Sequence, residues 1–384
     1  MNNVVRSRIG VLVVGRSLER VSFQCDGIAA GEVVVAGRFD HPRRGIVDCP
    51  AASLLAEIFR EHGFRVRIAD LHTTAAEIGN GESVVCTMSY LDHDGGPVGL
   101  GVATRTPAEP AAALGRDLIE RWSSVVRTRR VLVAVSETDV DDGWTVASVA
   151  AAVRAFAQRG DTVLVIGSPG SAASVISCAG QATVRVIAPG RTWPLTGIDP
   201  DRVSYVVAPG TPIEDAAEVV KLLRHRFPRL RGPHPREFCY AASDRRETVR
   251  SVAAAGNVVL VCDPEGEQAG DELLGWAGER ACPAHRVSRL SDLRSEWLGG
   301  AATVGVAVAS PAGMPLAGEL VTMLSGLGPL AAVRRRVVTE PFPHARTALH
   351  HVDDGVMASR DRMGHAALVR HGSVALCVTD RARA

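Results

Sequence analysis

The sequence lacks paired cysteines. Its eight cysteines stand singly along 384 residues, and none has the C-x-x-C spacing of a structural zinc site or a dithiol redox motif. They are Cys25, Cys49, Cys86, Cys178, Cys239, Cys262, Cys282 and Cys377. Isolated cysteines of this kind are typical of reduced thiols in a cytoplasmic protein.

Long apolar runs and an excess of one charge are missing too. No stretch of about 18 apolar residues without a charge occurs, so we expect no transmembrane helix. The start, Met-Asn-Asn-Val-Val-Arg-Ser-Arg, lacks the apolar segment of a signal peptide. A net charge of +1 gives no general attraction for nucleic acid or an anionic membrane. We expect a cytoplasmic protein whose partners are a small molecule or another protein.

Aromatic residues make up only 4% of the chain, whereas alanine, valine and glycine are abundant. From Arg130 onward, short Val/Leu/Ile runs alternate with helical patterns, which predicts an α/β fold with short, mainly parallel sheets. The expected strands are 131–135, 162–166, 183–187, 203–207, 258–262 and 302–307, with a last strand at 374–378. The expected helices are 145–158, 213–225, 246–255, 268–277 and 312–327.

The first 128 residues mix strands and helices less regularly. We expect a helix capped by Asp48 with Pro50 in its first turn, and a hairpin of residues 84–89 and 98–104 around Asp92-His-Asp-Gly-Gly96. His93 between two aspartates could bind a metal, but a solvated hairpin tip explains it as well. The same two interpretations apply to His350-His351 with Asp353-Asp354.

The most informative stretch is Gly232-Pro-His-Pro-Arg-Glu-Phe-Cys-Tyr-Ala-Ala-Ser-Asp-Arg-Arg-Glu247. Its lone cysteine, Cys239, precedes a predicted helix for which Ser243 is a plausible N-cap. A helix N-terminus stabilises a thiolate, which favours metal binding or reactivity at Cys239. The alternative is a buried structural cysteine, which the flanking Phe238 and Tyr240 favour.

Several short motifs in order resemble the LytB/IspH family, the 4-hydroxy-3-methylbut-2-enyl diphosphate reductases of the MEP isoprenoid pathway. They lie within about residues 129–329 and are Arg226-Phe-Pro228, Gly232-Pro233, Cys239-Tyr-Ala241, Val258-Val-Leu-Val261, Trp297 and Val304-Gly-Val306. The resemblance implies quasi-equivalent α/β lobes around a four-iron, four-sulfur (4Fe-4S) cluster, with one cysteine per lobe. It also implies an iron–sulfur oxidoreductase.

On that basis four parts are expected. Residues 1–128 form an N-terminal α/β region, either an extension or a stand-in for the family's first lobe. Residues 129–231 form the second lobe, residues 232–329 the third lobe, and residues 330–384 a C-terminal tail.

The sequence departs from the family at the cluster ligands. The family's first cysteine would follow the opening strand, but the strand at 131–135 continues as Ser136-Glu-Thr-Asp-Val-Asp-Asp-Gly143 without a thiol. The position of the family's second cysteine falls near Gly143-Trp144, which has no thiol either. Cys239 is thus the one family ligand retained. A cluster of this type needs three thiolates at least, so others would have to come from Cys25, Cys49 or Cys178.

The diphosphate-binding positions also differ. The family's Gly-His-x-Gly-His-x-Glu turn reads Gly167-Ser-Pro-Gly-Ser-Ala-Ala173, so serine replaces both histidines and alanine replaces the glutamate. Another phosphate-binding cluster becomes Glu267-Gln-Ala269, whose carboxylate would repel a diphosphate. The remaining candidate substrate-binding residues are Ser168, Gly170, Ser171 and Ser310. The alternative is a tight turn without a ligand.

Three functions follow from these observations. The first is an atypical, catalytically silent LytB-like protein that binds a ligand or a protein partner. The second is an active reductase of an allylic diphosphate or a related compound that uses a rearranged iron–sulfur site. The third is an ordinary doubly wound nucleotide-binding protein. Colour and iron content after anaerobic purification distinguish the first two.

Overall fold

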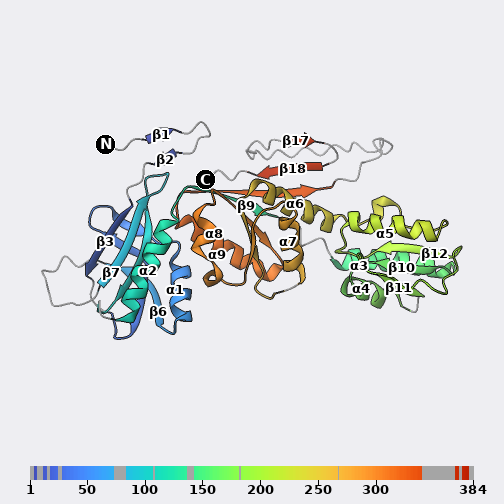
Figure 1. Cartoon of the computed structure of the whole chain (residues 1–384), viewed down its shortest axis with the longest axis horizontal. Helices are drawn as coiled ribbons and strands as arrows, with labels where there is room; N and C mark the ends of the chain where they lie inside the picture. The colour runs from blue at the N-terminus through green and yellow to red at the C-terminus, as the bar shows by residue number, and fades with distance from the viewer. Residues whose placement is uncertain are drawn as a thin grey trace, which may run out of the picture. The chain divides into compact units, whose positions relative to one another are not determined.

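A computed structural model describes residues 4–6, 12–14, 18–24, 28–72, 84–106, 109–135, 142–180, 183–266, 268–339, 368–371 and 374–379. The chain divides into two compact units. Unit 1 contains Met1–Ala134 and Arg250–Val333, and unit 2 contains Val135–Val249 and Arg334–Ala384. Figure 1 labels their elements.

Unit 1 contains a six-stranded mixed sheet in the order β3-β7-β8-β5-β4-β6. Two helices pack on it: α1 lies against β4 and β6, and α2 lies against β7 and β8. The strands are β3 (Glu19–Gln24), β4 (Glu32–His41), β5 (Gly45–Asp48), β6 (Arg65–Leu71), β7 (Val84–Leu91) and β8 (Pro97–Thr104), and the helices are α1 (Ala52–Glu61) and α2 (Pro110–Ser124). A separate pair, β1 (Val4–Arg6) and β2 (Leu12–Val14), is antiparallel.

A second sheet begins with four parallel strands in the order β14-β13-β15-β9. It continues through β16 into β18 and β17, which pair antiparallel. The strands are β9 (Arg129–Ala134), β13 (Val258–Cys262), β14 (Ala284–Val287), β15 (Thr303–Val308), β16 (Leu330–Val338), β17 (Leu368–His371) and β18 (Val374–Thr379). The accompanying helices are α6 (Ala241–Ala255), α7 (Gln268–Gly278), α8 (Ser295–Gly299) and α9 (Met314–Ser325), with 3₁₀ turns η2 (Leu290–Asp292) and η3 (Pro311–Gly313).

One hydrophobic core joins the two halves of unit 1. It contains Phe39, Leu55 and Trp122 from the N-terminal half together with Leu260 and Leu320 from the C-terminal half. Hydrogen bonds cross the same boundary, because the buried Arg129 guanidinium donates to backbone carbonyls at Val125, Leu298 and Leu327. The described residues within 28–131 and 258–327 therefore fold around a shared interior.

Unit 2 is built on a short parallel sheet in the order β11-β10-β12. Its elements are α3 (Asp142–Gln158), β10 (Thr162–Ile166), α4 (Pro169–Ala179), β11 (Val184–Ile187), β12 (Val203–Val207), α5 (Ile213–Arg226) and the 3₁₀ turn η1 (Pro235–Glu237). Alternate side chains of β10 enter different cores: Val163 and Val165 pack with α3 and α4, whereas Leu164 and Ile166 pack with α5. Both faces of the sheet are thus covered, as Figure 1 shows.

The expected α/β class with mainly parallel short sheets is confirmed, and three predicted strands match β10, β12 and β13 residue for residue. The predicted Asp48 cap is wrong. Asp48 ends β5, where it forms an ion pair with Arg38, and α1 begins later, after Ala51. The predicted boundaries at 128/129, 231/232 and 329/330 stay predictions.

His93 lies at the exposed turn between β7 and β8, with its ring nitrogens facing Asp92 and Asp94 at 3.0 and 3.2 Å. His350, His351, Asp353 and Asp354 lie outside the described residues. Among the helices that the structure describes, none is long and apolar enough to cross a membrane.

Candidate functional site

The carboxyl ends of β10 and β12 form the edge of unit 2 at which α4 and α5 begin. Ligands of open parallel sheets bind at such edges. Gly167 is needed between β10 and α4, because a Cβ there would lie 2.8 Å from both the Ala208 Cβ and the Thr211 hydroxyl. The absence of a side chain lets the two turns approach each other.

Ser168 is the N-cap of α4. Its hydroxyl accepts a hydrogen bond from the Ser171 backbone N–H at 3.2 Å, and it lies 2.9 Å from the Ser171 hydroxyl. Pro169 has no N–H, so Gly170 supplies the remaining backbone donor of this first turn. The candidate anion site therefore offers an anion fewer free hydrogen-bond donors than the presence of Ser168, Gly170 and Ser171 suggests.

The prediction that Ser243 is the N-cap of the helix after Cys239 is wrong. Helix α6 begins at Ala241, and the Asp244 N–H donates to the Tyr240 carbonyl, so Ser243 lies inside the helix. Its buried hydroxyl instead accepts from the Ile213 N–H at 2.8 Å and donates to the Glu214 carboxylate at 3.0 Å. Ser243 thus caps α5, whose own N-cap position is occupied by Pro212 without a side-chain cap.

Cys239 lies in the short connection between η1 and α6 and is half-buried. The neighbouring Phe238 and Tyr240 rings are 6.5 Å apart in an edge-to-face arrangement. The Tyr240 hydroxyl donates to the Pro235 carbonyl at 3.1 Å, which ties the connection to η1. The alternative of a buried structural cysteine stays a prediction at this half-buried position.

The remaining predicted residues are not part of this edge. Ser310 follows β15 in unit 1, where its hydroxyl is buried without a hydrogen-bond partner among the described residues. Glu267 and Cys25 lie outside the described residues. Of the predicted substrate-binding residues, Ser168, Gly170 and Ser171 are brought together at the start of α4.

The cysteines of the described residues do not provide the three-thiolate ligand set of a 4Fe-4S cluster. Cys178 is exposed near the end of α4, roughly 15 Å along the helix from Ser168. Cys49 belongs to unit 1, where burial raises the pKa of its thiol strongly. In the part of the chain that the structure describes, no three or more His, Cys, Asp or Glu side chains gather as metal ligands. The thiols in the part of the chain that the structure describes therefore do not fit a three-thiolate cluster site.

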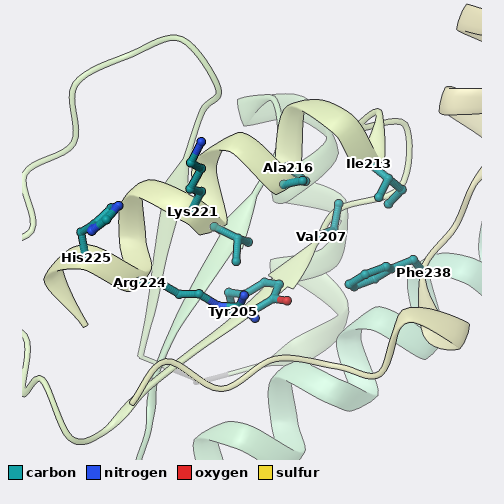
Figure 2. A pocket seen from close by; sticks show the side chains of 10 residues that line it. Tyr205, Val207, Ile213, Ala216, Lys221, Arg224, His225 and Phe238 are labelled. Atoms are coloured by element: carbon teal, nitrogen blue, oxygen red, sulfur yellow. The ribbon is translucent and has the colours of Figure 1, made fainter. Parts of the chain in front are cut away.

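The sequence did not point to a pocket on the face of the unit 2 sheet that carries α5. Its volume is about 420 Å³. The sides are formed by α5 and β12, and Phe238 closes one end, as Figure 2 shows. Apolar side chains and three basic residues line it: Tyr205, Val207, Ile213, Ala216, Ala217, Val220, Lys221, Arg224, His225 and Phe238. The signal that could have revealed it is the cluster of Lys221, Arg224 and His225 on successive turns of one helix.

Residues 143–325 match the family model described as LytB protein. Curated relatives include 4-hydroxy-3-methylbut-2-enyl diphosphate reductase 2 of Mycobacterium bovis, which is 30% identical over 197 residues, 51% of this chain and 60% of the relative. This part of the chain is a divergent LytB-family region. The match lies within the residues for which the motifs predicted it.

Other curated reductases match a similar share of this chain. The reductase of Leifsonia xyli subsp. xyli is 34% identical over 177 residues, 45% of this chain and 52% of that protein. The enzyme of Cronobacter sakazakii is 29% identical over 177 residues, 44% and 56% of the two chains. The chain therefore spans about half to three fifths of the length of the curated relatives it matches.

Among solved structures, the E-1-hydroxy-2-methyl-but-2-enyl-4-diphosphate reductase from Plasmodium falciparum is similar with a TM-score of 0.40 and 15% identity. The likeness covers 57% of this chain and 74% of that chain.

Proposed function

We propose that this chain is an atypical LytB-type protein that does not carry out the reduction named in its relatives and instead acts as a binding protein. The observation that carries the proposal is the donor set at the start of α4. Ser168 and Ser171 hydrogen-bond to each other, and the Ser171 N–H is already capped. No imidazole or carboxylate stands in this turn to hold a diphosphate or relay a proton.

The thiol positions support the same proposal. Between residues 135 and 249 the sequence has only Cys178, which lies in α4, and Cys239, which lies in the connection between η1 and α6. A rearranged site that recruits Cys49 would require deprotonation of a thiol in the core of unit 1, whose pKa burial raises. An active reductase with a rearranged cluster is therefore the less favoured function.

A turnover assay tests the proposal. The full chain, prepared without oxygen and supplied with a chemically reduced viologen dye, is incubated with 4-hydroxy-3-methylbut-2-enyl diphosphate. We expect no product above the protein-free control, and no difference between the native chain and Cys239→Ser. Product that disappears in Cys239→Ser would contradict the proposal and establish the rearranged reductase.

Binding of the same diphosphate is expected to be weak, because the Gly170 N–H and two hydroxyls are the donors at this turn. Calorimetric titration measures it. Tight binding that Ser171→Ala abolishes would show that the carboxyl edge is a diphosphate site after all.

A further inference from the structure

The pocket beside α5 combines an apolar body with a basic end. Val207, Ile213, Ala216 and Val220 supply aliphatic surface, and Phe238 closes the end near the start of α5 (Figure 2). Lys221, Arg224 and His225 lie toward the other end of the helix. Ile213 and Arg224 are roughly 16 Å apart along the helix axis, so the pocket suits an elongated ligand. Its volume of about 420 Å³ is in the range of small-molecule sites.

Tyr205 provides a second, independent sign of a ligand. The side chain lines the pocket and is 7% exposed, yet its hydroxyl has no hydrogen-bond partner among the residues that the structure describes. The hydroxyl is not among the described buried polar atoms that lack a partner, so it is open to the pocket, where it can donate a hydrogen bond to a ligand or to water. Burial raises the pKa of this phenol and the Arg224 charge opposes the rise, which keeps a donor proton on the hydroxyl.

The backbone holds Tyr205 in this position. The Tyr205 N–H donates to the Arg231 carbonyl at 2.8 Å, and a Cβ on the following Gly232 would lie 2.1 Å from the ring. Only a glycine lets the chain pass so close to the ring. The loop therefore packs against the hydroxyl end of the Tyr205 ring and holds the ring in place at the pocket wall.

The basic residues are not used elsewhere. Lys221 and Arg224 are exposed, and neither forms an ion pair with a residue that the structure describes. By contrast, the nearby Arg226 donates to the Leu195 carbonyl, and Arg229 forms an ion pair with Asp201 at 3.4 Å. Two unpaired cations at the end of an apolar pocket match an anionic head group.

From this geometry we propose that the pocket binds an amphipathic anion, an apolar chain that ends in a phosphate or carboxylate. The chain lies along Val207, Val220 and Phe238. The head meets Lys221 and Arg224, and a head or chain oxygen accepts a hydrogen bond from Tyr205. This site lies on the α5 face of unit 2 and involves none of Ser168, Gly170, Ser171 or Cys239, so it can be tested apart from the proposed function.

Calorimetric titration of the full chain with decyl phosphate tests the site, with 1-decanol and inorganic phosphate as the two halves of the probe. We expect decyl phosphate to bind at least ten times more tightly than either half. Decanoate, with the same chain and a carboxylate, distinguishes the head groups: tighter binding of decyl phosphate identifies a phosphate as the natural head, and equal or tighter binding of decanoate identifies a carboxylate.

Three variants locate the binding. Arg224→Gln and Lys221→Gln should each weaken decyl phosphate binding about tenfold and leave decanol binding unchanged, because they remove only the charge. Tyr205→Phe should weaken it several-fold, because it removes the one hydroxyl. Arg229→Gln, which removes a charge of the same sign outside the pocket, should have no effect. Absence of decyl phosphate binding, equal binding of decanol, or binding that Arg229→Gln weakens as much as Arg224→Gln would overturn the proposal.

Discussion

At the scale of single residues, several hydroxyl groups in the LytB-type region bond to the backbone. Ser168 caps its own helix, and Ser243 caps a neighbouring one. The sequence correctly placed Ser168, Gly170 and Ser171 on one turn, since a glycine-rich link between strand and helix has few solutions. It did not show that the Ser168 hydroxyl already accepts the Ser171 N–H, because a residue pattern does not specify which donor a hydroxyl meets.

Replacing Ser168 by alanine should destabilise the start of α4 by about 1 kcal/mol, the typical loss for an N-cap. Ser171→Ala is the matched control, because it keeps the Ser168 acceptor and the Ser171 N–H. Hydrogen exchange of peptides from α4 measures both. Equal destabilisation by the two substitutions would show that the contact between the hydroxyls, and not the cap, stabilises this turn.

His41 gives unit 1 a pH dependence. Its Nδ1 accepts hydrogen bonds from the Arg43 and Arg44 N–H groups at 3.1 and 3.2 Å, so the folded form needs a neutral ring. Burial, as the largest cause, lowers the pKa of His41 below 6.5, and the Arg43 and Arg44 charges add to this, whereas Glu19 opposes it. The unfolded chain then binds a proton at a pH where the folded chain does not.

The stability that depends on neutral His41 is complete above the unfolded pKa of about 6.5 and is lost as the pH falls below it toward the lower folded value. Urea unfolding of unit 1 between about pH 5 and pH 7.5 measures the effect. In His41→Asn, whose side-chain oxygen can still accept from the backbone, the loss of stability over this interval should be smaller. If the stability of His41→Asn has the same pH dependence as that of the native chain, the pH dependence comes from groups other than His41.

At the scale of elements, the strands were the most predictable part. β10, β12 and β13 are continuous apolar runs that are buried on both faces, and such runs have little freedom in where they begin and end. The order of the N-terminal sheet was not predicted, because β4 pairs with β6 and β8 through contacts distant in sequence. The pocket was missed for a related reason, since Tyr205 and Arg224 meet only when α5 packs on β12.

Ser243 connects two elements, so its removal should affect α5 more than α6. In Ser243→Ala the Ile213 N–H and the Glu214 carboxylate both lose a partner, and we expect a loss of about 1–2 kcal/mol at the start of α5. Ser177→Ala is the control, because its exposed hydroxyl bonds only to the Ala173 carbonyl within α4. Hydrogen exchange that accelerates in α6 and not in α5 would contradict the assignment of the cap.

At the scale of the whole molecule, the notable feature is that the LytB-type region shares a core with a region outside the family match. The Tyr90 hydroxyl donates to the Ser325 carbonyl at 2.8 Å and accepts from the Gly328 N–H at 2.9 Å. Tyr90 belongs to β7, whereas Ser325 ends α9 inside residues 143–325. The described part of residues 28–131 is therefore tied directly to the end of α9.

Tyr90→Phe should weaken unit 1 as a whole by about 1–3 kcal/mol, because a buried carbonyl and a buried N–H lose their partner. Hydrogen exchange should increase together in peptides from residues 28–131 and 258–327, and it should stay unchanged in residues 183–230 of unit 2. An increase confined to the N-terminal peptides would show that the two halves of unit 1 unfold separately.

The central proposal is that the LytB-type region is kept here without a 4Fe-4S cluster, and the iron and sulfide content of the protein tests it most directly. The full chain is purified without oxygen and assayed for iron and acid-labile sulfide beside Cys239→Ser. We predict a colourless protein with iron and sulfide at background in both. About four irons and four sulfides per chain, lost in Cys239→Ser, would contradict the proposal.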